Sequence, residues 1–166
     1  MAQLDLEKSS FEDFLKEDQE EVKKELESLE VRFKKERIEW TEKIKEMSGR
    51  LKNVMEVYLL QVDVYTERQR AVEYYHYILS LLSNLGIAYN KQYMAKYDYY
   101  LTQGNVRYPN ETSRTNKIMS ELSDLVNKRE QLQIHAKFIL STIGTIDNII
   151  YGIKYRIDLQ NISNGK

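Results

Sequence analysis

The clearest pattern in this chain is a heptad repeat of apolar residues in its last third. Apolar side chains recur at alternating spacings of four and three from residue 118 to residue 157, and Arg129 is the one exception. Such a repeat predicts a helix that packs along its whole length against other helices. The positions of this seam are Ile118, Leu122, Leu125, Arg129, Leu132, Ala136, Ile139, Ile143, Ile146, Ile150, Ile153 and Ile157.

The two halves of this seam differ in composition. The first half mixes Leu, Arg and Ala, whereas the second half consists of isoleucine. Isoleucine at both core positions of a heptad favours assemblies larger than dimers. We therefore expect the first half of the helix to pack on its own chain and the second half to pack on copies of the chain. The predicted oligomerisation residues are Ile139, Ile143, Ile146, Ile150, Ile153 and Ile157.

Helical spacing of apolar residues also marks the earlier part of the chain. The pattern shifts by four residues at Arg37, which is typical of a local unwinding of a coiled coil. Ser48-Gly49 marks a kink or a break, because glycine costs a helix about 1 kcal/mol relative to alanine. The predicted apolar face comprises Val22, Leu26, Leu29, Phe33, Trp40, Ile44, Met47, Leu51, Val54, Tyr58, Val62, Tyr65, Val72, Tyr75, Leu79 and Leu82.

The segment 103–110 is the strongest break in the helical pattern. Gly104 and Asn105 tolerate left-handed backbone, and Pro109 cannot continue a helix. Asn110 or Thr112 can cap a following helix. The chain is therefore expected to turn back on itself at this loop.

These patterns together predict an all-α fold. We expect a long antiparallel helical hairpin with an N-terminal coiled-coil extension, which assembles into a homo-oligomer. The extension is assigned to residues 1–37 and the hairpin, with its C-terminal oligomerisation helix, to residues 38–166. A hairpin of this kind has too little core to be stable alone, which again indicates self-association.

Composition supports long helices and limits the chemistry. The chain has 166 residues with 31% charged residues, one proline and no cysteine. The absence of cysteine excludes disulfides and thiolate chemistry. The N-terminus lacks the basic and apolar regions of a signal peptide, and no apolar run is long enough for a membrane span, so we expect a cytoplasmic protein without membrane contact.

The net charge of −1 conceals a strong asymmetry. Residues 1–30 carry eleven acidic residues against four lysines, a balance of −7, which leaves +6 for the rest of the chain. This acidic arm is either a solvated coiled-coil extension or an arm that docks on partners or mimics DNA. The sequence does not decide between these two interpretations.

Catalytic motifs are missing from the sequence. His76 and His135 are far apart and have no neighbouring nucleophile, so each is interpreted as a residue of a helix face. No phosphate-binding G-x-x-x-x-G-K-[ST] loop is present. We expect a protein that is not an enzyme and that needs no cofactor or metal.

Tyrosine and basic residues concentrate around the predicted loop. Six of the thirteen tyrosines lie between residues 89 and 108, and residues 91–117 hold five basic residues against two acidic ones. Tyr89, Tyr93, Tyr97 and Tyr100 lie at helical spacing, so they either pack on the second helix or stack bases. Aromatic rings beside cations are typical of single-stranded nucleic-acid binding. The predicted DNA-binding residues are Lys91, Lys96, Tyr99, Arg107, Tyr108, Arg114 and Lys117.

The order of motifs over residues 38–166 resembles the UvsY-type recombination mediators of T-even-like phages. The resemblance consists of the string Lys96-Tyr97-Asp98-Tyr99-Tyr100, a glycine-containing loop and a long amphipathic helix with a characteristic ending. The ending comprises Ile153-Lys154, Asp158 and Gly165-Lys166. The family has two basic residues, two positions apart, before the Asp-Tyr-Tyr. Lys96 matches the second and Met94 stands at the first, and Lys91 is expected to compensate from one turn earlier.

The resemblance implies a ring-forming accessory protein of about six to eight copies. It would bind single-stranded DNA, contact the phage single-strand-binding protein and load a RecA-like recombinase in the cytoplasm of the infected bacterial host. It would carry no ATPase of its own. The alternative is a structural coiled-coil scaffold or adaptor without nucleic-acid binding. The tyrosine and basic cluster of residues 91–117 distinguishes the two, because a structural rod does not need it.

Overall fold

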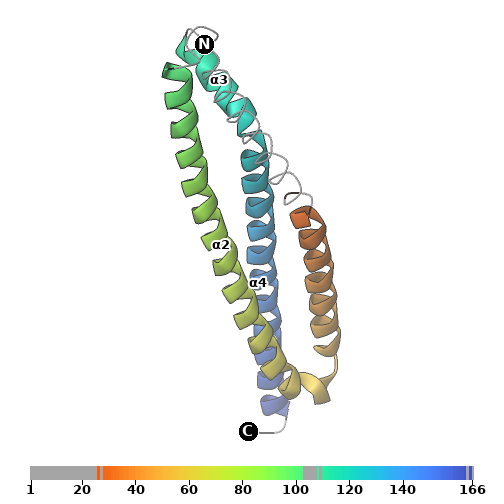
Figure 1. Ribbon diagram of the computed structural model, residues 1–166. Coiled ribbons are helices and arrows are strands. Elements are labelled where there is room, and N and C mark those ends of the chain that lie inside the picture. The colour runs from red at the N-terminus through yellow and green to blue at the C-terminus, as the bar shows by residue number, and fades with distance from the viewer. Residues whose placement is uncertain (1–25, 27, 103–107, 109, 164, 166) are drawn as a thin grey trace. The chain divides into compact units, whose positions relative to one another are not determined.

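The structure is a computed structural model that describes residues 26, 28–102, 108, 110–163 and 165. Every regular element in these ranges is a helix, which confirms the predicted all-α class. An N-terminal helix is described over residues 28–50 and is followed by the 3-10 turn η1 (Val54–Glu56). The remaining elements are α2 (Val57–Thr102), α3 (Glu111–Glu121) and α4 (Ser123–Ser163) (Figure 1). None of the described helices is both long and apolar enough to cross a membrane.

The chain divides into two compact units, each built from segments that are distant in sequence. Unit 1 comprises Met1–Arg32 and Leu82–Gln131, and unit 2 comprises Phe33–Leu81 and Leu132–Lys166. The domain boundary expected at residue 37 lies inside the N-terminal helix, which continues to residue 50. Helices α2 and α4 each contribute residues to both units.

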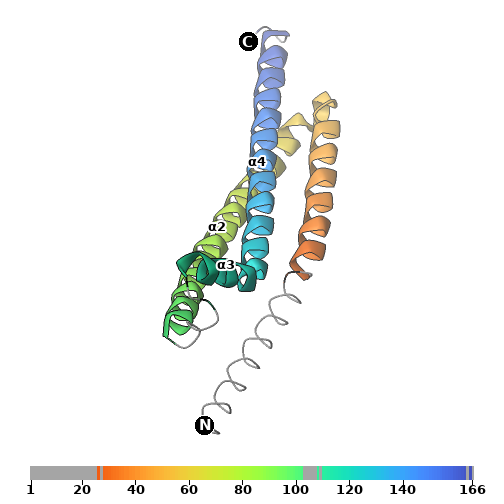
Figure 2. The same ribbon diagram turned by 90° about the horizontal axis from the view of Figure 1, so that it is seen from above.

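Unit 2 is a bundle of three helical segments. The N-terminal helix runs antiparallel to α2, because Lys43 binds Glu67 at 2.5 Å and Arg50 binds Asp63 at 2.7 Å. The N-terminal helix and α4 lie side by side in both views (Figures 1 and 2). An ion pair of 2.6 Å between Arg68 Nε and Asp147 Oδ1 joins α2 to α4.

The heptad seam of α3 and α4 is buried, as its spacing predicts. Its exposed fractions lie between 0 and 8% at every position except Arg129 and Ile157. Burial of a side chain of this size stabilises the fold by about 1.5–3 kcal/mol relative to leaving it exposed. The buried members are Ile118, Leu122, Leu125, Leu132, Ala136, Ile139, Ile143, Ile146, Ile150 and Ile153.

The apolar face predicted for the first half of α2 is wrong, because the helix is rotated about its axis and buries a neighbouring set of positions. Tyr58, Val62 and Tyr65 are 55, 68 and 44% exposed. The helix instead buries Val57, Leu60, Val64, Ala71 and Ile78, each with no exposed surface. The register resets because the N-terminal helix ends at residue 50 and Asn53 starts a new turn by accepting a hydrogen bond from Met55 N. The break predicted at Ser48-Gly49 thus lies a few residues later.

The described part of unit 1 contains the first residues of the N-terminal helix, the end of α2, all of α3 and the start of α4. Asn110 caps α3, as one of the two predicted candidates, and its side chain accepts a hydrogen bond of 2.7 Å from Ser113 N. The single helix expected after the loop is divided at Leu122, where φ is −97° and ψ is 8°. Figure 2 shows the change of direction between α3 and α4. Most of the predicted loop, residues 103–107 and 109, lies outside the described residues.

Candidate nucleic-acid interface

The centre of the candidate interface in unit 1 is the carboxylate of Glu121, the last residue of α3. Lys96 Nζ donates a hydrogen bond of 2.9 Å to its Oε2 atom. Tyr100 donates from its hydroxyl to Oε1 at 2.5 Å, and Lys117 Nζ lies 3.0 Å from the same atom. Lys96 and Tyr100 are one turn apart on α2, whereas Lys117 and Glu121 are one turn apart on α3. The cluster therefore ties the end of α2 to α3.

Burial makes this cluster strong. Lys96 is 6% and Tyr100 7% exposed, so their contacts with Glu121 are shielded from water. Burial alone would raise the pKa of the Glu121 carboxyl. Hydrogen bonds from Tyr100, Lys96 and Lys117 more than offset it and hold this pKa below its ordinary value of 4.5. Burial, followed by the hydrogen bond to Glu121, raises the pKa of Tyr100 above its ordinary value of 10.0.

Arg114 and Tyr108 extend the cluster toward the start of α3. Arg114 Nη1 donates a hydrogen bond of 3.1 Å to the carbonyl oxygen of Tyr108, and Arg114 is only 9% exposed. The ring of Tyr108 contacts that of Tyr100 edge to face, with a centroid distance of 5.3 Å. Tyr99 contacts Tyr100 in the same manner at 5.2 Å. The structure thus brings five of the seven predicted DNA-binding residues into one neighbourhood of unit 1: Lys96, Tyr99, Tyr108, Arg114 and Lys117.

The remaining two predicted residues lie elsewhere. Arg107 is outside the described residues. Lys91 is exposed, but it does not share a helix face with Lys96, because positions five apart point about 140° away from each other on an α-helix. The missing basic residue belongs at Met94, which is exposed and three positions from Lys91, so the two share a helix face. That Lys91 compensates for Met94 stays a prediction.

The tyrosine stripe on α2 forms a ladder of rings. Tyr89 stacks on Tyr93 with centroids 6.2 Å apart, and Tyr93 stacks on Tyr97 at 6.4 Å. All three are half-buried, whereas Tyr100 is buried. These half-buried rings have some surface packed against the protein and some surface accessible to solvent. The structure is therefore compatible with both predicted roles, packing on the second helix and stacking of bases.

Five of the six predicted oligomerisation residues are buried inside unit 2. Ile139 and Ile146 are fully buried, Ile153 is 1% exposed, and Ile143 and Ile150 are each 8% exposed. Ile157 is partly exposed. The second half of the seam therefore packs on its own chain, whereas its composition suggests packing on copies. Its role in self-association stays a prediction.

A buried polar network in unit 2 has no counterpart among the sequence-based expectations. His135 has no exposed surface, so the helix face on which it lies is a buried face of α4. Its Nε2 atom lies 3.0 Å from Glu36 Oε2, and the hydroxyl of Tyr74 donates to the same carboxylate. Phe33 stacks on the histidine ring at 4.1 Å. The polar groups come from three helical segments, so no local sequence pattern could identify the network.

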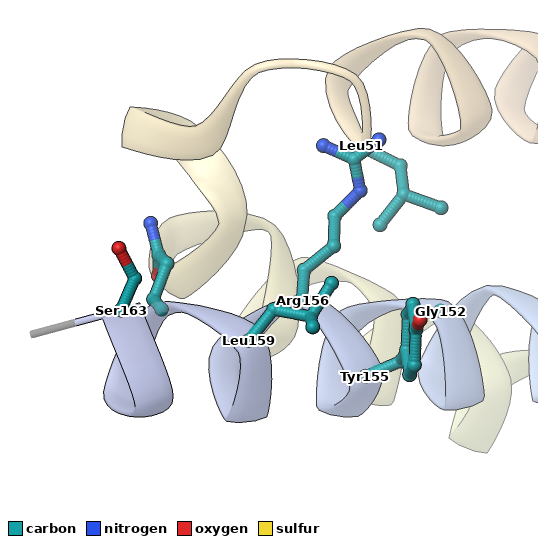
Figure 3. A pocket seen from close by; sticks show the side chains of 7 residues that line it. Leu51, Gly152, Tyr155, Arg156, Leu159 and Ser163 are labelled. Atoms are coloured by element: carbon teal, nitrogen blue, oxygen red, sulfur yellow. The ribbon is translucent and has the colours of Figure 1, made fainter. Parts of the chain in front are cut away.

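A hollow of about 500 Å³ lies at the end of unit 2 that carries Leu51 (Figure 3). Arg156 reaches from α4 toward this turn and donates a hydrogen bond of 3.3 Å to the carbonyl oxygen of Lys52. The described lining residues include no carboxylate or histidine, so they offer no acid–base pair for catalysis. They are Leu51, Gly152, Tyr155, Arg156, Leu159, Gln160 and Ser163.

Comparisons with protein-family models, with curated proteins and with solved structures find no match to this chain.

Proposed function

We propose that this chain is a helical recombination mediator that binds single-stranded DNA at the α2–α3 end of unit 1. The observation that carries the proposal is the convergence of Lys96, Lys117 and Arg114 with Tyr100 and Tyr108 in one neighbourhood. The same segment contains the motif that resembles the UvsY-type mediators. Cations neutralise phosphates and aromatic rings stack bases, and this combination tolerates any sequence.

In this proposal the protein acts as a homo-oligomer. One protomer offers few cations and binds weakly, whereas several linked copies bind the same strand by multivalency. The assembly bends the strand, weakens its coat of phage single-strand-binding protein and presents it to a RecA-like recombinase. The protein itself does not hydrolyse nucleotides, and it acts in the cytoplasm of a phage-infected bacterium.

A structural coiled-coil scaffold is the second candidate. The burial of Lys96 favours it, because a lysine that is 6% exposed and paired with Glu121 stabilises the fold without any ligand. A scaffold has long helices and self-association but does not bind nucleic acid.

Fluorescence anisotropy of a labelled oligothymidine across a salt series separates the two candidates. A mediator is expected to bind single strands more tightly than duplex, and log K should fall against log salt with a slope of about −0.7 for each phosphate contacted. Lys117→Gln is the informative variant, since Lys117 is 38% exposed. Lys45→Gln is its matched control, because Lys45 is an exposed lysine of the N-terminal helix in unit 2.

Weaker binding and a shallower salt slope in Lys117→Gln, with no change in Lys45→Gln, would support the proposed interface. Equal effects of both substitutions would mean that the strand does not bind at this cluster. No binding by the assembled wild-type protein at low salt would reject the mediator and leave the scaffold as the better account.

A further inference from the structure

The carboxylate of Glu121 occupies a cradle of hydrogen-bond donors. Two ammonium groups, from Lys96 at 2.9 Å and Lys117 at 3.0 Å, and the hydroxyl of Tyr100 at 2.5 Å all contact it. Three donors around one pair of anionic oxygens would equally suit two oxygens of a phosphate group, which is recognised by the same donors. The cradle holds two positive charges against one negative charge.

We propose that this cradle is a phosphate site, which Glu121 fills in the strand-free protein and a phosphodiester of single-stranded DNA fills in its place. This inference rests on the proposed function, because it assigns a strand contact within the same interface. Glu121 is then an internal competitor of DNA. Lys96, although buried, belongs to the binding site.

The donors of the cradle are held in place by packing. Lys96 and Tyr100 are both more than nine-tenths buried on α2, so their positions do not depend on a ligand. The Lys117 side chain is 38% exposed and opens the cradle toward solvent, whereas the Glu121 side chain is 11% exposed. A phosphate that approaches along Lys117 meets donors that are already oriented, and preorganised donors lower the cost of binding.

The backbone next to Glu121 allows its side chain to withdraw. Glu121 is the last residue of α3, and Leu122 has φ of −97° and ψ of 8°, outside regular helical values. Residues at the ends of elements are the ones that absorb changes of backbone angle. Strand binding at the cradle would therefore be coupled to a movement at the junction of α3 and α4, shown in Figure 2.

The test compares Glu121→Gln with Glu130→Gln in the full-length chain. Both substitutions remove one negative charge from unit 1, but Glu130 is exposed on α4 and does not contact the cradle. Without the carboxylate, we expect oligothymidine to bind on the order of five- to tenfold more tightly in Glu121→Gln than in Glu130→Gln. The salt slope should steepen by about 0.7 for each further phosphate that the strand places against the protein.

Glu121→Asp provides a second variant in case Glu121→Gln unfolds, as monitored by circular dichroism. Aspartate keeps the charge but shortens the reach toward Lys96, so an intermediate increase in affinity is expected. Equal affinities of Glu121→Gln and Glu130→Gln, both at or above the affinity of the wild type, would overturn the phosphate site and leave the proposed function intact.

If no variant binds the oligonucleotide, the proposed function fails and a second measurement judges the site by itself. A calorimetric titration with inorganic pyrophosphate should then show binding to Glu121→Gln and no binding to Glu130→Gln. Absence of binding to both variants would overturn the site as well.

Discussion

Lys96 is a lysine whose charge is satisfied inside the protein. Its ammonium group is 2.9 Å from Glu121 and its residue is 6% exposed. Removing one partner of a buried ion pair leaves the other partner shielded from water with fewer hydrogen bonds, which destabilises a fold more than removing both. The same side chain therefore has a role in stability whether or not it contacts DNA.

Lys96→Ala is expected to lower the free energy of unfolding by about 2–4 kcal/mol, because Glu121 then loses the ammonium group that is 2.9 Å from its carboxylate. Lys91→Ala, at an exposed position of the same helix, should change it by less than about 0.5 kcal/mol. Urea denaturation of both variants measures the difference. Equal stability of the two variants would mean that the Lys96–Glu121 pair does not support the fold.

The same carboxylate predicts a dependence of stability on pH. The pKa of Glu121 is below 4.5 in the folded protein. Below pH 4.5 the unfolded chain therefore takes up this proton more readily than the folded one. The stabilisation is fully present above about pH 5 and is lost as the pH falls through the folded pKa. Urea denaturation from neutral to acidic pH should show a steeper loss for the wild type than for Glu121→Gln, and parallel curves would contradict the assignment.

At the scale of elements, the turn between the N-terminal helix and α2 decides which face of α2 is buried. The apolar spacing of the sequence runs through this turn without interruption, so extending it predicts Tyr58, Val62 and Tyr65 as core. The chain reverses direction there, and α2 begins with a new rotation about its axis. The spacing of α4 contains no such reversal, and its predicted core positions are buried.

Two glycines of α4 test how closely the helices of unit 2 approach. A Cβ atom added at Gly144 would meet nothing within 4 Å, so Gly144→Ala should stabilise the protein by up to about 1 kcal/mol. A Cβ atom at Gly152 would lie 2.9 Å from Leu51 Cδ2, so that Gly152→Ala should stabilise it less or destabilise it. Thermal unfolding compares the two variants, and an equal rise in Tm would show that Leu51 does not restrict this position.

At the scale of the whole molecule, each compact unit is assembled from segments that are far apart in sequence. Unit 2 joins Phe33–Leu81 to Leu132–Lys166, and the isoleucines of α4 are covered by helices from the first of these segments. A heptad seam specifies that a helix packs against other helices, but it does not specify whether these belong to the same chain. This is why the spacing of the late isoleucines is equally compatible with packing on copies of the chain.

Ile146→Ala distinguishes a core role from an interface role. Ile146 is fully buried in unit 2, so its truncation should lower the free energy of unfolding by about 2–5 kcal/mol. Leu140→Ala on the same helix is the control, because Leu140 is 52% exposed and should have little effect. Denaturation and sedimentation of both variants provide the measurement. If Ile146→Ala instead dissociates to monomers without losing stability, Ile146 lies at an interface between copies of the chain.

The sequence by itself determined the helical class, the seam of α4, the two candidates Asn110 and Thr112 for the cap of α3, and the concentration of tyrosine and basic residues around the loop. All of these follow from local spacing and local backbone preferences. Only the tertiary structure decided that Lys96 and Arg114 are buried and that Glu121 collects Lys96, Tyr100 and Lys117. It also decided that His135, Glu36 and Tyr74 meet. Except for Lys117 and Glu121, which are one helical turn from each other, these interactions join residues separated by 21 to 99 positions in the sequence. A one-dimensional pattern does not specify which helix packs against which.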